Sequence, residues 1–537
     1  MSKLDQLLGK LSYAFPSVPK SYKTLLGTAT NIDILNGINF KLWYKGIKVN
    51  LDQMDLNLYL QRFGRVKIDI NMDGLPLSKT GGSKLKFWPT LGKLKETENE
   101  PFIIALYCGE TDPRDIDLFM GDLTLELHSL YQNGYDHQGE NHAFEVENFI
   151  LDAPARSLVK CCVQHGGYGA CEKCDVRGVY VADRMSYAVV GPEVRLRTDA
   201  SFANQEDRFH HNGVSPLTMI NEIGLVSNFR LDTMHLVYKG AFLRLGKLLG
   251  FIVSCPEDFN RKPRKIEEFY KYKATELRRL LLYDGVVAFK DEMEDNIHRL
   301  FCLLHCAIYI LASRHLLANF HAHAEVFLRS FVQYSAEVFS NHFVVYNIHS
   351  LLHLTDECRV HGVLENFSAF CFENHLKSIK ETLKSGYLPL EQIVKRDSER
   401  SINIPVHIKG IENSVQLSHQ HIDPCEQENG DQFKKIIVNN VVFKIGRKNG
   451  CFITNDKRVA VLKNIVQRDQ NTVCFIGHCF TSYENLYDYP INSSDLGIFI
   501  ASELNLARET FPLQDIVGKS WLLEIGNKSQ LCRVTEK

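Results

Sequence analysis

The sequence lacks the features that place a chain in a membrane, outside the cell or in a fibre. Spanning a bilayer takes about 20 apolar residues, and the most apolar run, from Leu300 to Ser313, has only 14 residues. The first residues lack the unbroken apolar stretch of a secretory signal. The 34 glycines and 16 prolines among 537 residues are too few for a fibrous or low-complexity chain. We therefore expect neither a membrane protein nor a secreted or collagen-like one.

A surplus of charge of one sign is missing as well. The 62 lysines and arginines face 64 acidic residues, a formal net charge of -2, so a nucleic acid would have to meet a local basic patch. A composition of 45% hydrophobic and 23% charged residues is typical of a globular chain that buries several cores. In the absence of a secretory signal, we expect the 15 cysteines as thiols or metal ligands and not as disulfides.

A strand pattern begins near Val66. Apolar side chains alternate with polar ones up to Asp73, which predicts a half-buried strand that ends at Gly74 and Pro76. Further elements follow in the order strand, strand, helix, strand, over residues 84–94, 101–110, 112–134 and 142–152. The chain becomes helical from 257 to 349. Residues 411–432 are polar and suggest a linker, and short β-rich runs follow them.

Two aspartates close the first and fourth predicted strands. Carboxylates at adjacent strand ends can hold two divalent cations for phosphodiester chemistry, and hard oxygen ligands suit Mg²⁺ or Mn²⁺. Asp73 and Asp152 are the candidates. In the simpler interpretation, Asp73 belongs to a turn and Asp152 caps the helix that follows it. Asp69, on the same strand face as Asp73, is a rival for the same role.

A second kind of metal site is indicated by Cys171 and Cys174. Two thiolates separated by two residues form half of a tetrahedral zinc site, although a redox pair or two unpaired thiols have the same pattern. The best partners are His349 and His353, which lie four residues apart and share a helix face. These four residues together predict a structural zinc ion.

Two helical motifs carry further polar residues. Asp232 and His235 lie three apart, where they could support a metal site or form an ordinary buried pair at a helix start. Glu373 shares a polar stripe with Lys377 and Lys380, which would suit a phosphate backbone, while a solvated Glu373–Lys377 pair is the alternative. A candidate phosphate patch precedes them at Arg261, Lys262, Arg264 and Lys265.

Four segments together resemble DDE transposases of the CACTA (En/Spm) type, over roughly residues 15–400. The segments that carry the resemblance are INMDGLPLSKTGGSKLKFWPTLGKL, FILDAPARSLVKCCVQHGGYGACEKC, RLDTMHLVYKGAFLRLG and NIHSLLHL with FSAFCFENHLKSIK. The resemblance implies an α/β RNase H-like catalytic core that is split by a large helical insertion, in agreement with the predicted strand order. It implies Asp73, Asp152 and Glu373 as catalytic, magnesium-binding carboxylates, with Asp232 and His235 as a supporting D-x-x-H signature.

The spacing of the Cys and His motifs adds to the resemblance. The CxxC begins 19 residues after Asp152, and His353 lies 20 residues before Glu373. These offsets resemble the zinc-bearing insertion of recombination-activating recombinases, in which the zinc would clip the insertion to the core. The expected domains are residues 1–60, a core over 61–180, an insertion over 181–345, closing helices over 346–410, a linker over 411–432 and a β-rich domain over 433–537.

The function implied is metal-dependent cleavage and strand transfer of double-stranded DNA, at transposon ends and target, in the nucleus and as a homo-oligomer on DNA. The residues before the first strand show no zinc-finger or helix-turn-helix pattern, so recognition of specific DNA ends is unexplained. Two alternatives remain open. One is a domesticated, catalytically silent DNA- or chromatin-binding protein, and the other is a host nuclease that cuts without strand transfer.

Overall fold

The computed structural model of the chain shows mixed α/β architecture with helices and several sheets. The residues that it describes are 3–29, 32–77, 84–187, 194–248, 266–290, 293–399, 403–409, 415–423, 430–438, 441–446, 449–469, 472–525 and 528–533. These residues form two compact units, one within Met1–Leu236 and Phe367–Lys409 and one within Val237–Asn366 and Gly410–Lys537.

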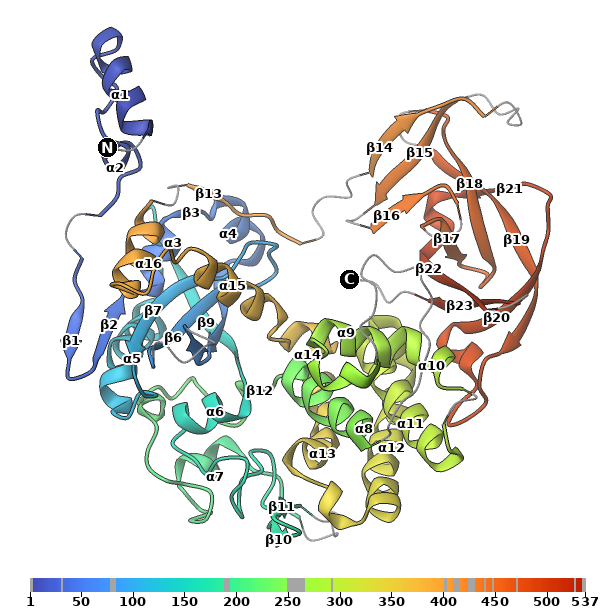
Figure 1. Ribbon diagram of the computed structural model, residues 1–537, viewed down its shortest axis with the longest axis horizontal. Coiled ribbons are helices and arrows are strands. Elements are labelled where there is room, and N and C mark those ends of the chain that lie inside the picture. The colour runs from blue at the N-terminus through green and yellow to red at the C-terminus, as the bar shows by residue number, and fades with distance from the viewer. Residues whose placement is uncertain are drawn as a thin grey trace. The chain divides into compact units, whose positions relative to one another are not determined.

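The first unit is built on one sheet with the strand order β1-β2-β7-β6-β4-β9-β12 (Figure 1). The strands are β1 (Leu35–Gly37), β2 (Phe40–Tyr44), β4 (Arg65–Met72), β6 (Lys86–Leu94), β7 (Phe102–Gly109), β9 (Glu140–Leu151) and β12 (Phe229–Leu231). β4 runs antiparallel to β6 and parallel to β9, and β12 runs parallel to β9. The carboxyl ends of β4, β9 and β12 therefore lie at the same edge of the sheet.

Helices and short strands complete this unit. The helices are α1 (Lys3–Ala14), α2 (Tyr22–Leu25), α3 (Ile47–Asp52), α4 (Asn57–Phe63), α5 (Ile116–Asn133), α6 (Ala153–Val159), α7 (Asp199–Ala203), α15 (Phe370–Glu381) and α16 (Pro389–Ser398). The short strands are β3 (Met54–Asp55), β5 (Leu75–Pro76), β8 (Tyr135–His137), β10 (Val179–Val181), β11 (Arg184–Ser186) and β13 (Ile404–Pro405). The predicted elements at 84–94, 101–110, 112–134 and 142–152 are thus present as β6, β7, α5 and β9.

Strand β4 differs from the half-buried strand that its alternation predicts. Its apolar side chains enter a core with α5, but the polar residues Asp69 and Asn71 are buried too. Helix α15, more than 290 residues further along the chain, covers this polar face, where its Cys371 lies near Asp69. An alternating polar pattern predicts an exposed strand face only when no other element packs on that face. Here a helix from far along the chain packs on it, so Asp69 and Asn71 are buried.

Two parts of the first unit were not expected. The N-terminal region, which has no clear sequence pattern, supplies β1 and β2 at one sheet edge. β12 lies within 181–345, which we predicted as a mostly helical insertion. Between residues 194 and 231 the described chain forms α7, a 3-10 turn and β12, and longer helical structure begins only at Met234.

The second unit combines helices with an antiparallel sheet. The α- and π-helical elements are a π-helix (Met234–Phe242) that begins in the first unit, α8 (Leu243–Leu248), α9 (Ala274–Arg279), a second π-helix (Leu280–Asp284), α10 (Gly285–Ala288), α11 (Asp295–Ala312), α12 (Arg314–Phe339), α13 (Tyr346–Ser350) and α14 (Leu354–His361). The strands are β14 (Val415–Gln420), β15 (Asp431–Val438), β16 (Val441–Lys444), β17 (Cys451–Thr454), β18 (Val459–Gln467), β19 (Val473–Asn485), β20 (Ile498–Leu504), β21 (Glu509–Pro512), β22 (Ile516–Ile525) and β23 (Lys528–Arg533).

The antiparallel sheet lies in the C-terminal region that we predicted as β-rich, but it starts earlier than residue 433. β14 lies inside 411–432, which we predicted as a linker, and pairs with β15 at one end of the sheet. Its residues, VQLSHQ, are mostly exposed, so the strand has no apolar face for a sequence pattern to reveal. Within the described residues, no helix combines the length and apolar composition needed to cross a bilayer.

A buried polar contact joins α11 to the β-rich domain within the second unit. His305 Nδ1 donates to the Leu281 carbonyl oxygen at 2.8 Å, so Nε2 is left to accept a hydrogen bond from the Tyr487 hydroxyl at 3.0 Å. Cys306 Sγ also lies 3.5 Å from that hydroxyl. Burial lowers the pKa of His305 to about 4, which keeps the imidazole neutral at physiological pH. The β-rich domain is therefore packed on the helices and is not an appended module.

We expect Tyr487→Phe to destabilise the second unit by about 1–3 kcal/mol, because the buried His305 Nε2 would lose its partner. The variant should lower the thermal unfolding midpoint by several degrees in differential scanning calorimetry. Tyr489→Phe is the matched control, since Tyr489 is part-exposed and stacks its ring on Arg299, a contact that phenylalanine keeps. Equal midpoints for the two variants would mean that the His305 contact contributes nothing.

Candidate functional site

The two predicted strand-end aspartates lie side by side at one sheet edge. Ile70 of β4 pairs with Phe149 of β9 in parallel register, and Asp73 and Asp152 each follow three residues after this pair. Parallel neighbours end at the same edge, so both carboxylates reach it together. The sequence alone predicted the two strands and their terminal aspartates but not this register.

Glu373 joins them from the first turn of α15. Its carboxyl group shares a hydrogen bond with that of Asp73. Burial, followed by the charges of Asp152 and Glu373, raises the pKa of Asp73 well above its usual range, and only His235 opposes this shift. Three carboxyl groups from positions 73, 152 and 373 therefore meet in one small, part-buried site, where their mutual repulsion favours a bound proton or cation.

Asp152 also caps the helix that follows it. One of its carboxylate oxygens accepts a hydrogen bond from the Ala155 amide at 2.8 Å, and Pro154 lies in the first turn of α6. Serine, threonine, aspartate and asparagine are the residues that satisfy these free amides best. The simpler interpretation of Asp152 is therefore correct, and it is compatible with a metal site because the cap uses one oxygen of the two.

The Asp232 and His235 pair belongs to the same site. His235 Nδ1 lies 2.5 Å from Asp232 Oδ2, and His235 Nε2 lies 3.5 Å from Glu373 Oε1. Burial alone would lower the pKa of His235, but the bond to Asp232 and the charges of Asp232, Glu373 and Asp152 raise it to about 9. The imidazole is thus a cation that partly neutralises the carboxylates.

Asp232 has a second role that the sequence did not reveal. Its Oδ1 accepts a hydrogen bond of 2.8 Å from the amide of Ala369, the residue that precedes α15. The same residue that orients His235 therefore also fixes the start of the helix that carries Glu373. The sequence could not reveal this second role, because the two residues that form the hydrogen bond are 137 positions apart.

Asp69, the rival of Asp73, is held in a separate buried network. It accepts a hydrogen bond from Asn148 Nδ2 at 2.7 Å and lies 3.2 Å from Lys95 Nζ. Burial raises its pKa to about 6, although Lys95 and Asn148 work against this shift. Arg230 in turn donates to Asn148 Oδ1 at 2.6 Å. These contacts engage Asp69 in a polar row across the sheet, which accounts for its charge without a metal.

The two predicted DNA-binding lysines on α15 contact other groups of the protein. Lys377 pairs with Glu381 at 3.5 Å and its side chain is 74% exposed, so the alternative Glu373–Lys377 surface pair is not the one formed. Lys380 donates to the Pro76 carbonyl oxygen at 2.5 Å, close to the end of β4. Arg261, Lys262, Arg264 and Lys265 lie outside the described residues.

The four predicted zinc ligands form a cluster. Cys171, Cys174, His349 and His353 each offer one ligand atom, and these atoms all lie within 4.8 Å of one another. All four residues are buried. The two thiols lie 3.4 Å apart, and their shared hydrogen bond, followed by burial, raises the pKa of Cys174. A buried set of two sulfurs and two imidazole nitrogens is a donor set that can bind a metal such as zinc.

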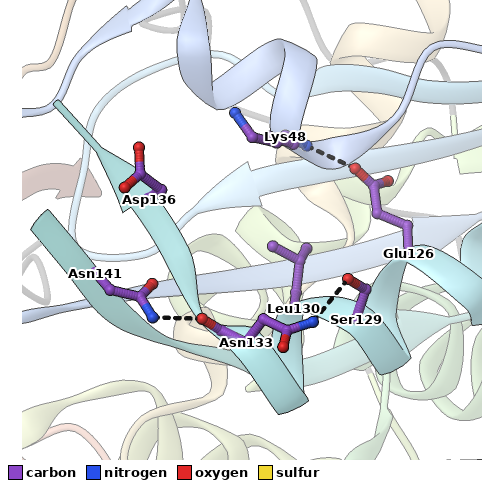
Figure 2. A pocket seen from close by; sticks show the side chains of 8 residues that line it. Lys48, Glu126, Ser129, Leu130, Asn133, Asp136 and Asn141 are labelled. Carbon is purple, nitrogen blue, oxygen red and sulfur yellow. Dashed lines mark hydrogen bonds between the residues drawn. The ribbon is translucent and has the colours of Figure 1, made fainter. Parts of the chain in front are cut away.

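A separate open pocket lies at the other end of β9, near Asn141 (Figure 2). Its volume is about 360 Å³. Two charged groups in its wall have structural partners: Lys48 pairs with Asp52 at 2.8 Å, and the Glu126 carboxylate accepts the backbone amides of Ile47 and Lys48 at 2.7 and 2.8 Å and so caps α3. The pocket is therefore distinct from the carboxylate site, which lies beyond the last residue of the same strand.

Comparison with known families and proteins adds one finding. A family described as a domain of unknown function (DUF8592) matches residues 417–534. This match covers the strands of the C-terminal β-rich domain and none of the carboxylate or Cys/His residues. No curated protein matches the chain.

Proposed function

We propose that the chain is a DDE transposase-like enzyme that cleaves DNA phosphodiester bonds and transfers the strands with the help of divalent cations. The observation that carries the proposal is the meeting of Asp73, Asp152 and Glu373. Burial is the largest cause of the raised pKa of Asp73, and the charges of Asp152 and Glu373 raise this pKa further. Perturbed carboxyl groups that converge at one part-buried position are typical of catalytic sites.

The topology supports the RNase H-like part of the proposal. β7, β6 and β4 are antiparallel neighbours, and β9 and β12 continue the sheet parallel to β4. Candidate carboxylates follow β4 and β9, and the third lies on α15, which covers the sheet face that carries Asp69 and Asn71. A long segment between β12 and α15 belongs to the other compact unit, as a large insertion requires.

The carboxylates fit Mg²⁺ or Mn²⁺, because these hard cations prefer oxygen ligands. Asp73, Asp152 and Glu373 would hold the ions. Bound divalent cations in such sites activate a water molecule and stabilise a leaving oxygen. Within the protein, Asp232 orients His235 through its Oδ2 and anchors α15 through its Oδ1. Glu373 is therefore held on the side facing Asp73.

The Cys/His cluster fits Zn²⁺ by the softness of its thiolates and by its burial. Cys171, Cys174, His349 and His353 would hold that ion, whose role would be structural. Double-stranded DNA as substrate, assembly of several copies on DNA, and a nuclear location all follow from the proposed function and are proposed with it.

The test is a reaction of the purified full chain with duplex DNA and Mn²⁺. We expect nicked and joined products that require the metal ion and disappear in EDTA. Products that are only nicked and never joined would favour a nuclease. DNA binding without any product, at all Mn²⁺ concentrations, would favour the catalytically silent DNA-binding protein.

Lys377 and Lys380 allow a separate test of how DNA is held. Because the net charge of -2 gives no general attraction, binding must depend on local cations such as these two. If both contact phosphates, Lys377→Ala/Lys380→Ala should lower the log–log salt slope of DNA binding by about 2, at roughly 0.9 per contact. The loss of affinity should be similar for all sequences.

Fluorescence anisotropy with labelled duplexes over a range of KCl measures this slope. Lys395→Ala is the control, as it removes an exposed lysine from α16 of the same unit. A slope equal to that of the wild type would assign Lys377 and Lys380 to their contacts with Glu381 and Pro76 alone.

A further inference from the structure

Arg156 is a buried arginine next to the carboxylate site. It lies in α6, four residues after Asp152, and is only 3% exposed. Its Nη1 donates to the carbonyl oxygens of Leu151 and Arg230, at 2.5 and 3.1 Å. Its Nε donates to Glu172 Oε1 at 2.8 Å. One guanidinium therefore joins three separate segments of the first unit.

Two of these segments carry site residues. Leu151 is the last residue of β9 and directly precedes Asp152, while Arg230 lies in β12, two residues before Asp232. These strands are parallel neighbours, and Arg230 and Ile150 are paired in register. Nη1 thus bridges the ends of the two strands that precede Asp152 and the Asp232–His235 pair.

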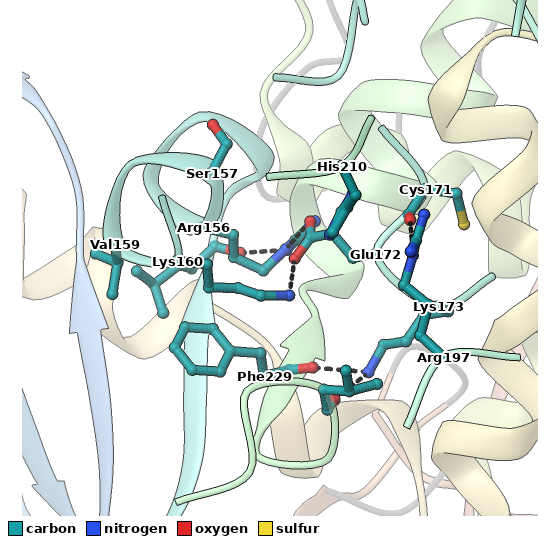
Figure 3. A network of polar contacts seen from close by, with 12 residues as sticks. Arg156, Ser157, Val159, Lys160, Cys171, Glu172, Lys173, Arg197, His210 and Phe229 are labelled. Atoms are coloured by element: carbon teal, nitrogen blue, oxygen red, sulfur yellow. Dashed lines mark hydrogen bonds and ion pairs between the residues drawn. The ribbon is translucent and has the colours of Figure 1, made fainter. Parts of the chain in front are cut away.

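The third segment is the CxxC loop. Glu172 lies between Cys171 and Cys174, and Figure 3 shows it facing Arg156 and Lys160. Its Oε1 lies 2.8 Å from Arg156 Nε and its Oε2 lies 2.8 Å from Lys160 Nζ, so this buried carboxylate is paired with two cations. Glu172 thus supplies the charge that lets Arg156 remain buried as a cation.

The loop itself is also fixed to β12 and to the turn that precedes it. Lys173 Nζ donates to the carbonyl oxygens of Val226 and Phe229, both at 2.8 Å. Lys160 completes the network with a contact of 2.8 Å to Glu172 and lies over the rings of Phe202 and Phe229. Within the described residues, Lys160 makes no hydrogen bond to the strand-end carbonyls that Arg156 contacts.

We propose that Arg156 is a positioning residue for the metal-binding carboxylates and that Glu172 of the CxxC loop holds it in place. This inference rests on the proposed function. Groups that orient metal ligands typically change metal affinity or activity by about 10–100-fold when they are altered. A guanidinium suits this role because its planar donors can serve several acceptors at once, whereas a lysine ammonium is a point charge.

The test measures Mn²⁺ affinity and DNA cleavage in the full chain. Arg156→Lys keeps the positive charge but cannot reach all three acceptors. We expect its Mn²⁺ dissociation constant, measured by electron paramagnetic resonance, to rise about 10–100-fold. Cleavage should fall at low Mn²⁺ and recover as Mn²⁺ is raised, while DNA affinity stays unchanged. If Arg156 were important only for folding, raising the Mn²⁺ concentration would not restore cleavage by Arg156→Lys.

Two further variants sharpen the result. Lys160→Met removes the other cation at Glu172 without touching the strand ends, and we expect Mn²⁺ affinity like that of the wild type. Glu172→Gln keeps hydrogen bonding but removes the charge, and it should weaken Mn²⁺ binding in the same direction as Arg156→Lys. Glu172→Gln decides the question by the same measurement if Arg156→Lys does not fold.

The outcomes separate this inference from the proposed function. The Mn²⁺ site is identified as the binding that Asp152→Asn removes. Wild-type Mn²⁺ affinity and cleavage in the variants at positions 156 and 172 would overturn the positioning role and leave the proposed function intact. A wild-type chain that neither binds Mn²⁺ at this site nor cleaves DNA would overturn both.

Discussion

Asp152→Asn should abolish Mn²⁺-dependent nicking and joining of DNA, with a loss of at least about 100-fold. Even residues that only support a metal ligand cost 10–100-fold, so a ligand itself should cost more. Asparagine caps helices as well as aspartate does, so the Ala155 amide keeps its acceptor and α6 should stay folded. The substitution therefore removes the charge and leaves the cap.

Asp152→Ala removes both functions and should be equally inactive. The lost cap adds a destabilisation of about 0.5–2 kcal/mol, which a thermal melt would detect. Asp73→Asn and Glu373→Gln should match Asp152→Asn in activity, because the three carboxyl groups share one site. Rates are measured on a labelled duplex at saturating Mn²⁺, with DNA binding followed in parallel.

Asp69→Asn is the informative control for this series. It sits on the same strand as Asp73 but contacts Lys95 and Asn148. We expect a smaller loss of activity there than at Asp73. If Asp152→Asn kept the metal-dependent activity of the wild type, the assignment of the carboxylate site would be wrong.

Loss of zinc should have the second large effect. Freshly purified protein should contain about one zinc per chain, and Cys171→Ser/Cys174→Ser should contain none. Zinc binding contributes directly to folding free energy, on the order of 10 kcal/mol in small zinc domains. We therefore expect the double variant to unfold at a much lower temperature than the wild type, or to be recovered in poor yield.

The measurement is elemental analysis by mass spectrometry, combined with a thermal melt before and after chelation. His349→Asn/His353→Asn should lose the ion too, because all four ligand atoms lie within 4.8 Å of one another. Cys161→Ser/Cys162→Ser is a matched control, since it removes two neighbouring thiols that are not part of the cluster. Absence of zinc from the wild-type protein, or zinc retained by Cys171→Ser/Cys174→Ser, would contradict the proposed site.

Much of the candidate site could be predicted from short stretches of sequence. The alternation before Asp73, the buried strand before Asp152 and the amphipathic pattern around Glu373 are local signals, since each depends on residues a few positions apart. The CxxC and the His349–His353 pair are likewise short motifs. The metal-binding chemistry of cysteine and histidine was enough to predict a metal site from these two motifs, and the four residues do form a cluster.

The tertiary structure decided everything that depends on distant neighbours. β12 has three residues, too few to show a period, and it is a strand only because β9 pairs with it. Asp69 and Asn71 are polar but buried, because α15 folds over them from far along the chain. The docking of Tyr487 on His305 has no sequence signal, as it joins residues 182 positions apart.

The same reason explains the network around Arg156. The sequence names Asp152, the CxxC and Asp232 as separate motifs, and nothing in their spacing indicates that one guanidinium contacts the strand ends and the loop that carry them. Local patterns determine which residue types stand at which strand and helix ends. Which of those ends meet, and which buried charges compensate one another, depends on the packing of the complete sheet and the helices that cover it.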